Sequence, residues 1–130
     1  KPEIALDKNP HLTFSLSHSG DYVVLAFSLK KAIGVDVEQI KELPEYLELA
    51  QHFFTQEEFN EIKEIRHFYN CWTAKEAYVK ALGVGLQKPL DSFCIKKDFI
   101  IEKGCRLDDW KIYQIDQIPD YALSIAVQEE

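Results

Sequence analysis

The sequence of 130 residues contains no methionine, and it has only five glycines and five prolines. No internal repeat, low-complexity segment or linker divides it. We therefore expect a single domain over residues 1–130, a length sufficient to bury a core of its own. Because methionine is missing and the chain begins with Lys1, we expect it to be a processed or trimmed piece of something longer.

Long hydrophobic runs and an excess of basic charge are also missing. The longest apolar run is too short to span a bilayer, and the first residues carry no secretory signal, so we expect no membrane partner. Acidic residues outnumber basic ones by 22 to 15, and the net charge is −7. This balance argues against nucleic acid as the main ligand, because phosphate backbones bind basic surfaces. An anionic small molecule can still bind where a few lysines and a metal ion are gathered locally.

Cysteine is scarce, and its spacing suggests no pairing. Cys71, Cys94 and Cys105 are an odd number and form no Cys-x-x-Cys motif. This pattern favours buried, reduced thiols over a zinc site or a disulfide. Reduced thiols in turn favour a cytoplasmic location.

The secondary-structure signals that are present begin with a β-rich block. Residues 11–17 alternate apolar and polar side chains, and residues 21–29 are rich in valine and aromatics. The Ser-Gly-Asp sequence at residues 19–21 has turn chemistry, which predicts an antiparallel hairpin. Residues 32–38 are a third, β-branched run.

A helical block follows, and strand candidates close the chain. We expect a short helix over residues 45–52. Thr55 and Glu58 match a capping box that opens a second helix toward Ile65, and a long helix over residues 67–82 ends before a glycine. The final strand candidates are residues 92–97, 111–115 and 121–127. This order predicts an α+β fold in which the long helix packs on an antiparallel sheet.

Two carboxylates, Asp36 and Glu38, lie two residues apart on a predicted strand. Their side chains therefore leave the same face, roughly 7 Å apart along the strand. The neighbouring residues are apolar, so two close negative charges here need a compensating positive charge. A hard cation such as Mg²⁺ prefers this kind of oxygen ligand. On its own, the Asp-x-Glu pattern is a weak signal that favours an exposed acidic strand end over a metal site.

The long helix adds a third carboxylate, Glu76, between Lys75 and Lys80. An i,i+4 pair of Glu76 with Lys80 is one interpretation, and it leaves Lys75 without a role. A metal-and-phosphate site is the other interpretation. In that site Glu76 faces the cation, and both lysines face phosphate oxygens.

His18 follows Ser17 at the end of a predicted strand. A solvated histidine and a ligand-binding histidine are both consistent with this place. A serine hydrolase is not indicated, since the Gly-x-Ser-x-Gly motif is absent and the spacing suggests no third partner.

Four segments taken together resemble the 4′-phosphopantetheinyl transferase superfamily. They are SLSHSGDYVV, GVDVE, FFTQEEF and WTAKEAYVKALGVGL, in this order and spacing. The Trp72 and Glu38 within them resemble the surfactin-synthetase type more than the shorter holo-acyl-carrier-protein-synthase type. The resemblance covers essentially the whole chain, although the strands after Asp91 match only in pattern.

The resemblance implies a set of site residues, carried over position by position. The magnesium ligands are Asp36, Glu38 and Glu76. Contacts with coenzyme A come from Ser17 and His18, which face the phosphates, and from Lys75 and Lys80, near the pyrophosphate. Lys1 and Pro2 look like the tail of the family's Gly-Lys-Pro motif, which also belongs to the coenzyme A site. Glu58 matches a carboxylate proposed as the catalytic base.

The implied reaction is Mg²⁺-dependent transfer of 4′-phosphopantetheine from coenzyme A to a serine of an apo acyl or peptidyl carrier protein. Glu58, or a water that it orders, accepts the serine proton, and Lys75 stabilises the departing 3′,5′-adenosine bisphosphate. Glu58 fits equally well as a structural capping-box residue beside Thr55.

Enzymes of the surfactin-synthetase type are a pseudo-dimer of two similar halves, with coenzyme A bound between them. This chain resembles only the second half. We therefore expect either a missing N-terminal half or a homo-oligomer that rebuilds the cleft. The alternatives are a non-catalytic half-domain or subunit that cannot bind coenzyme A alone and, more remotely, a Mg²⁺-dependent phosphoesterase.

Overall fold

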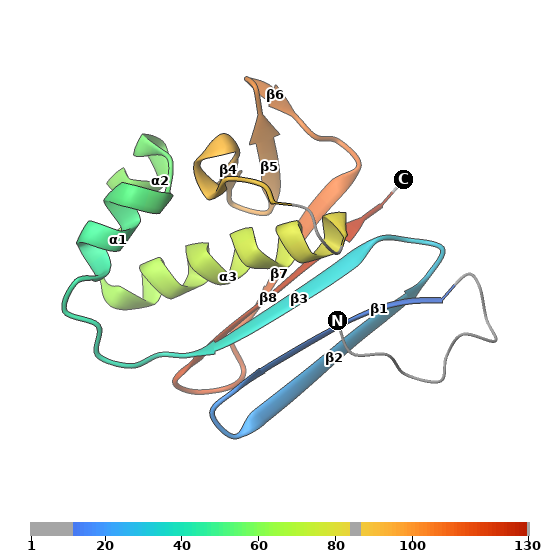
Figure 1. Ribbon diagram of the computed structural model, residues 1–130, viewed down its shortest axis with the longest axis horizontal. Coiled ribbons are helices and arrows are strands. Elements are labelled where there is room, and N and C mark those ends of the chain that lie inside the picture. The colour runs from blue at the N-terminus through green and yellow to red at the C-terminus, as the bar shows by residue number, and fades with distance from the viewer. Residues whose placement is uncertain (1–11, 84–86, 130) are drawn as a thin grey trace.

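The long helix α3 lies across an antiparallel sheet, and a β hairpin covers part of the opposite face of that sheet (Figure 1). The computed structural model describes residues 12–83 and 87–129. In chain order its elements are β1 (Leu12–Ser19), β2 (Tyr22–Leu29), β3 (Ile33–Gln39), α1 (Tyr46–Phe53), α2 (Gln56–Asn60), α3 (Ile65–Leu82), a 3-10 turn (Leu90–Ser92), β4 (Cys94–Lys96), β5 (Phe99–Glu102), β6 (Cys105–Arg106), β7 (Trp110–Ile115) and β8 (Tyr121–Gln128). The predicted α+β class is confirmed.

The central sheet has the strand order β3-β8-β7 and presents one face to α3. Gly34 lies where β3 passes closest to the helix, because a Cβ atom built there would be 2.0 Å from the backbone oxygen of Ala77. Alternate residues of a strand share a face, so Asp36 and Glu38 point to the same side as Gly34. In the register of the sheet, Asp36 lies opposite Ser124, whose hydroxyl is 2.8 Å from that of Thr73 on α3. The close helix approach thus brings both acidic residues under α3.

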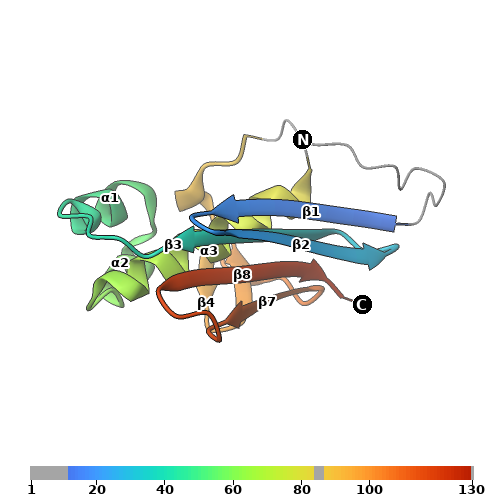
Figure 2. The same cartoon turned by 90° about the horizontal axis from the view of Figure 1, so that it is seen from below.

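The predicted hairpin is confirmed, with β1 and β2 paired along their whole length. A backbone ladder does not connect this hairpin to the central sheet. Instead, the hydroxyl oxygens of Ser15, Ser17 and Ser19 accept hydrogen bonds from backbone N–H groups of β3, at 3.0, 3.0 and 2.9 Å. Figure 2 shows the hairpin beside β3 from below. Because these serines alternate along β1, the other face of the hairpin is turned away from the sheet.

That outer face of β2 is apolar and open to solvent. Val23, Leu25, Phe27 and Leu29 are 71, 45, 65 and 62 % exposed. Four large apolar side chains in a row on one strand face are unusual at a free surface and typical of an interface. We call these four residues the β2 face.

The helices α1 and α2 and the start of α3 enclose an aromatic cluster that includes Phe54, Phe68 and Trp72. The second helix is shorter than predicted: α2 ends at Asn60, and the buried Ile62 then turns into this cluster. The short strands β5 and β6 were not predicted, and β4 is shorter than the segment expected there. Across the described residues, no helix is long and apolar enough to cross a membrane.

Candidate functional site

Three carboxylates gather where β3 passes under α3. Asp36 and Glu38 leave the same face of the strand, as predicted, and Glu76 comes from the helix above. They are close enough that Glu38 and Glu76 both repel the charge on Asp36, and Glu76 repels that on Glu38. We call Asp36, Glu38 and Glu76 the carboxylate cluster.

Asp36 is the most deeply placed member, with 5 % of its surface exposed. Its Oδ1 atom accepts hydrogen bonds from Lys80 Nζ at 3.2 Å and from Ser17 Oγ at 3.4 Å. Its Oδ2 atom is buried and has no hydrogen-bond partner. Burial raises the pKa of Asp36 to about 7, against the attraction of Lys80 and with added repulsion from Glu38. Burying an ionised carboxylate with an unpaired oxygen raises the free energy of the folded state, and a bound cation would offset this penalty.

The other two members show the same excess of negative charge. Burial raises the pKa of Glu38 and that of Glu76, and the attraction of Lys80 only partly opposes it. Oxygen ligands with surplus negative charge fit a hard divalent cation such as Mg²⁺. In residues 12–83 and 87–129, however, no three His, Cys, Asp or Glu side chains already converge as a ligand set. The cluster therefore has the donor chemistry of a metal site without a closed cage of ligands.

Lys80 supplies the positive charge at the cluster. Its ammonium group donates to the backbone oxygens of Val35 at 3.0 Å and Leu16 at 3.4 Å, besides Asp36. In the structure Lys80 thus forms its ion pair with Asp36, rather than the i,i+4 pair with Glu76. Because 35 % of the Lys80 side chain is exposed, this ammonium can exchange its partners for a ligand in solvent.

Ser17 and His18 are neighbours on β1, but they differ in exposure and, because side chains alternate along a strand, lie on opposite faces of it. The Ser17 hydroxyl is buried and already bonds Val37 N and Asp36 Oδ1. His18 is exposed at the end of the strand. The imidazole is therefore free to meet a ligand, whereas the Ser17 hydroxyl holds Asp36 and β3 in place. Lys1 and Pro2 lie outside the described residues.

Lys75 and Glu76 have different neighbours in the structure, and a common cleft lined by both remains a prediction. The side chain of Lys75 is fully buried, and its Nζ atom is 2.8 Å from the carboxylate of Glu58. The ammonium also donates to the backbone oxygen of Phe93 and lies 4.1 Å from the centre of that ring. Adjacent helix residues point about 100° apart, so Lys75 and Glu76 face different neighbours. A phosphate contact of Lys75 remains a prediction that this enclosure disfavours.

Glu58 joins three elements. The predicted capping box is confirmed: its backbone N–H donates to Thr55 Oγ1 at 3.2 Å, and its carboxylate accepts from Thr55 N at 3.0 Å. The same carboxylate accepts from Ile95 N of β4 at 2.6 Å and from Lys75 of α3. These bonds give Glu58 a structural role, while its action as a base remains a prediction.

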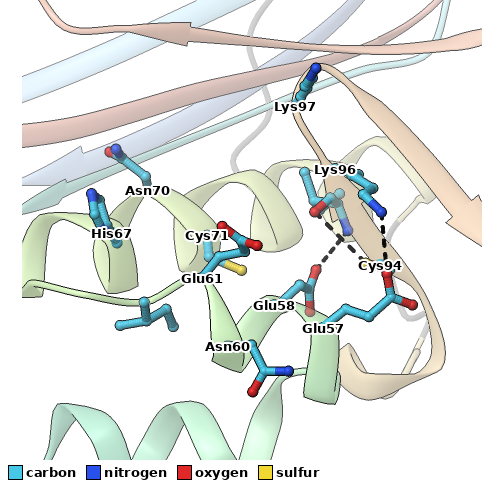
Figure 3. A pocket seen from close by; sticks show the side chains of 12 residues that line it. Glu57, Glu58, Asn60, Glu61, His67, Asn70, Cys71, Cys94, Lys96 and Lys97 are labelled. Atoms are coloured by element: carbon cyan, nitrogen blue, oxygen red, sulfur yellow. Dashed lines mark hydrogen bonds and ion pairs between the residues drawn. The ribbon is translucent and has the colours of Figure 1, made fainter.

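A cavity of about 510 Å³ opens beside Glu58, between α2, α3 and β4 (Figure 3). Cys71 and Cys94 line it, and no member of the carboxylate cluster does. Burial raises the pKa of both thiols, and the nearby Glu58 charge adds to the effect, so they are protonated at neutral pH. The three cysteines of the chain are free, as expected, although Cys105 is exposed rather than buried.

Two smaller grooves, in contrast, reach the carboxylate cluster. One, of about 440 Å³, is lined by Glu76, Val79 and residues 87–90. The other, of about 260 Å³, is lined by Glu38 and by apolar and aromatic side chains that include Trp72. A substrate approaching the cluster can thus lie along either of these grooves.

The structural role of Glu58 leads to a test that separates it from catalysis. Glu58→Gln keeps the capping acceptor but leaves the buried Lys75 charge unpaired, so we expect a loss of about 3–5 kcal/mol in the free energy of unfolding. Glu58→Gln combined with Lys75→Met removes both charges and should recover most of that loss. Urea denaturation measures both effects. Glu57→Gln is the matched control, because its pair with Lys96 is exposed and should contribute less than about 0.5 kcal/mol.

The double variant then tests Glu58 as the base. If Glu58 only positions α2, α3 and β4, a folded Glu58→Gln, Lys75→Met protein keeps its single-turnover rate. A fall of about 10²-fold or more in that rate, with the fold intact, would instead establish a catalytic role for Glu58, for Lys75 or for both.

The comparisons with known proteins agree on one family. The family model described as the 4′-phosphopantetheinyl transferase superfamily matches residues 32–126. The 4′-phosphopantetheinyl transferase Sfp of Bacillus subtilis (strain 168) is 33 % identical over 128 residues, which cover 89 % of this chain and 55 % of that protein. The 4′-phosphopantetheinyl transferase gsp of Aneurinibacillus migulanus is 31 % identical over 133 residues, covering 95 % and 53 %.

One solved structure supports the fold. The holo-[acyl-carrier-protein] synthase of Thermotoga maritima aligns with a TM-score of 0.54 over 76 % of this chain and 63 % of that chain, at 18 % identity. An identity this low bears on the fold alone. The chain spans about half the length of the transferases Sfp and gsp.

Proposed function

Since the chain belongs to the 4′-phosphopantetheinyl transferase superfamily, we propose that it is the metal-holding half of such an enzyme. The enzyme would transfer 4′-phosphopantetheine from coenzyme A to a serine of an apo acyl or peptidyl carrier protein. The observation that carries this proposal is the carboxylate cluster, with its unpaired buried oxygen on Asp36. The three free thiols favour a cytoplasmic place for the reaction.

In this proposal Asp36, Glu38 and Glu76 hold Mg²⁺, which when bound neutralises charge on the pyrophosphate of coenzyme A. Lys80 and His18 would bind phosphate oxygens, since Lys80 is partly exposed at the cluster and His18 is exposed on the neighbouring strand β1. Ser17 would act mainly by orienting Asp36.

The reaction also needs a proton acceptor and a group that stabilises the leaving group. The serine oxygen of the carrier protein would attack the phosphorus of the phosphopantetheine group while its proton passes to water or, in the alternative, to Glu58. The P–O bond of the pyrophosphate would break, and 3′,5′-adenosine bisphosphate would leave. Lys80 is better exposed than Lys75 for stabilising that leaving group. Lys75 and Glu58 would support the reaction by fixing α3, and the base role of Glu58 is kept as the alternative tested above.

The β2 face is where we propose that the other half of the enzyme packs. Its four apolar residues are exposed in this chain, and the relatives are about twice as long. An upstream half of similar fold, or a second copy of the chain, would cover this surface and complete a coenzyme A cleft next to the hairpin. Without such a partner, we expect the alternative function: a half-domain or subunit that does not bind coenzyme A productively.

The identity of the products tests this function. The chain, supplied with an upstream half in cis or as a separate chain, is incubated with coenzyme A, Mg²⁺ and apo carrier protein. Mass spectrometry should find carrier protein that has gained one phosphopantetheine group, together with 3′,5′-adenosine bisphosphate. Free phosphopantetheine with unmodified carrier protein would instead indicate a phosphoesterase. If no mixture of the chain and an upstream half turns over coenzyme A, the alternative of a non-catalytic half-domain or subunit is favoured.

A further inference from the structure

A tyrosine at the start of β8 holds the turn of the hairpin from the face of the central sheet on which the hairpin packs. Tyr121 is only 6 % exposed, and its hydroxyl oxygen accepts a hydrogen bond from Asp21 N at 3.1 Å. Its ring also meets the ring of Tyr22 edge-on, with 4.7 Å between the centroids. Two successive residues of the turn are thus bound to one side chain 100 residues further along the chain.

The turn is seated closely on this tyrosine. Gly20 has a φ of +55°, and a Cβ atom built there would be 2.1 Å from the Tyr121 hydroxyl oxygen. Any side chain at this position would have to push the turn away from Tyr121, in addition to its unfavourable backbone conformation. The neighbouring Ser19 is held as well, because its hydroxyl accepts from Gln39 N at 2.9 Å.

Core packing alone accounts for the ring of Tyr121 but not for its hydroxyl. The ring belongs to the apolar cluster of Val35, Val37 and Leu123, where a phenylalanine would fill the same space. A buried hydroxyl needs a hydrogen-bond partner, and here the partner is the backbone of the turn. The hydroxyl therefore fixes where the turn lies relative to the central sheet.

The residue whose position depends on the turn is His18, which directly precedes it. Its neighbour Ser17 is tied to Asp36 and its other neighbour, Ser19, belongs to the turn, so the position of the turn contributes to the backbone position of His18 relative to the carboxylate cluster. We propose that Tyr121 is a positioning residue: through the turn at residues 19–22 it holds His18 in place for the phosphates of coenzyme A. This inference rests on the proposed function, since it requires that His18 contacts these phosphates.

The test compares Tyr121→Phe with the matched control Tyr78→Phe. Tyr78 is also buried, at 3 % exposure, and its hydroxyl contacts Glu102 at 3.5 Å, away from the hairpin. In the enzyme completed by its upstream half, Tyr121→Phe should raise the KM for coenzyme A about 5- to 20-fold and change kcat less than about twofold. Tyr78→Phe should change neither. Hydrogen exchange of the Asp21 amide in the chain alone should become faster only in Tyr121→Phe.

A second variant and a double-mutant cycle keep the outcome decisive. Gly20→Ala displaces the turn from an unsubstituted Tyr121 and should raise the same KM. In a His18→Ala background, Tyr121→Phe should add no further increase, because it acts through that imidazole. If His18→Ala raises KM but Tyr121→Phe does not, or if the two effects simply add, the positioning role is refuted. If His18→Ala itself leaves KM unchanged, the phosphate contact in the proposed function fails, and the inference fails with it.

Discussion

The chain alone, as a monomer, is expected to transfer phosphopantetheine poorly or not at all, and an upstream half should restore the reaction. A one-sided cleft leaves the adenine and 3′-phosphate in water, where a phosphate contact is screened and weak. Holding the pyrophosphate in line with the serine oxygen can lower the reaction barrier by several kcal/mol. Loss of one side of the cleft should therefore lower turnover by roughly 10²-fold or more, and it should also lower the affinity for coenzyme A. The measurement is a mass-spectrometric assay of carrier-protein modification, with the oligomeric state determined in the same buffer. Full activity from a demonstrated monomer would contradict the two-half account.

A substitution on the β2 face tests whether the upstream half packs there. Phe27 is 65 % exposed, so Phe27→Asp should leave the fold of the chain intact while it blocks restoration by the upstream half. Tyr113→Asp is the control, because Tyr113 is a 40 % exposed aromatic residue on β7 and not on the hairpin. Restoration should survive that change. If Phe27→Asp is restored as well as the unmodified chain, the other half packs elsewhere.

The second large effect is expected from Asp36→Asn. Removing a metal ligand should lower transfer by about 10²- to 10³-fold, since charge stabilisation by the cation is worth several kcal/mol. Glutamate side chains alone would remain in the cluster, and Lys80 would keep its two backbone acceptors. Asp98→Asn is a matched control, because the pair of Asp98 with Lys111 is exposed and at 3.8 Å. Transfer at the wild-type rate by Asp36→Asn would remove the metal assignment.

The same substitution should change how stability depends on pH. Without metal, the folded pKa of Asp36 is about 7, above its ordinary value of 3.8, so the folded state binds more protons between these values. The free energy of unfolding should therefore fall as pH rises from about 4 to 7, by at most about 4 kcal/mol at about 1.4 kcal/mol per pKa unit. Asp36→Asn should flatten this fall, and Mg²⁺ should reverse it in the wild type. Urea denaturation across this pH range measures both; equal pH profiles for the two proteins would contradict the placement of Asp36.

Local patterns predicted the parts of the fold that depend on local chemistry. The alternation in β1 and the turn at residues 19–21 indicated the hairpin, and the side-chain spacing of Thr55 and Glu58 indicated the capping box. The common face of Asp36 and Glu38 follows from the two-residue period of a strand. Each of these features is set by neighbours within a few residues.

The features that sequence reasoning missed are tertiary. Nothing near Lys75 in the sequence indicates Glu58, 17 residues away, and only the packing of α2 against α3 brings them together. Helix geometry alone predicts that adjacent residues such as Lys75 and Glu76 have different neighbours. The serine contacts to β3 had a signal as well: three serines alternate along β1, which is unusual for a strand face that becomes buried. The strands β5 and β6 are too short for a periodicity to be recognised.

The claim on which the whole account depends is that Asp36, Glu38 and Glu76 bind a divalent cation together with coenzyme A. Isothermal titration of Mg²⁺ or Mn²⁺ into the chain tests it directly, because all three carboxylates belong to this chain. We expect binding by the wild type that, in the chain completed by its upstream half, tightens when coenzyme A is present, since the pyrophosphate supplies further oxygen ligands. Asp36→Asn should lose both the binding and its dependence on coenzyme A. Equal binding by the two proteins, with and without coenzyme A, would contradict the account.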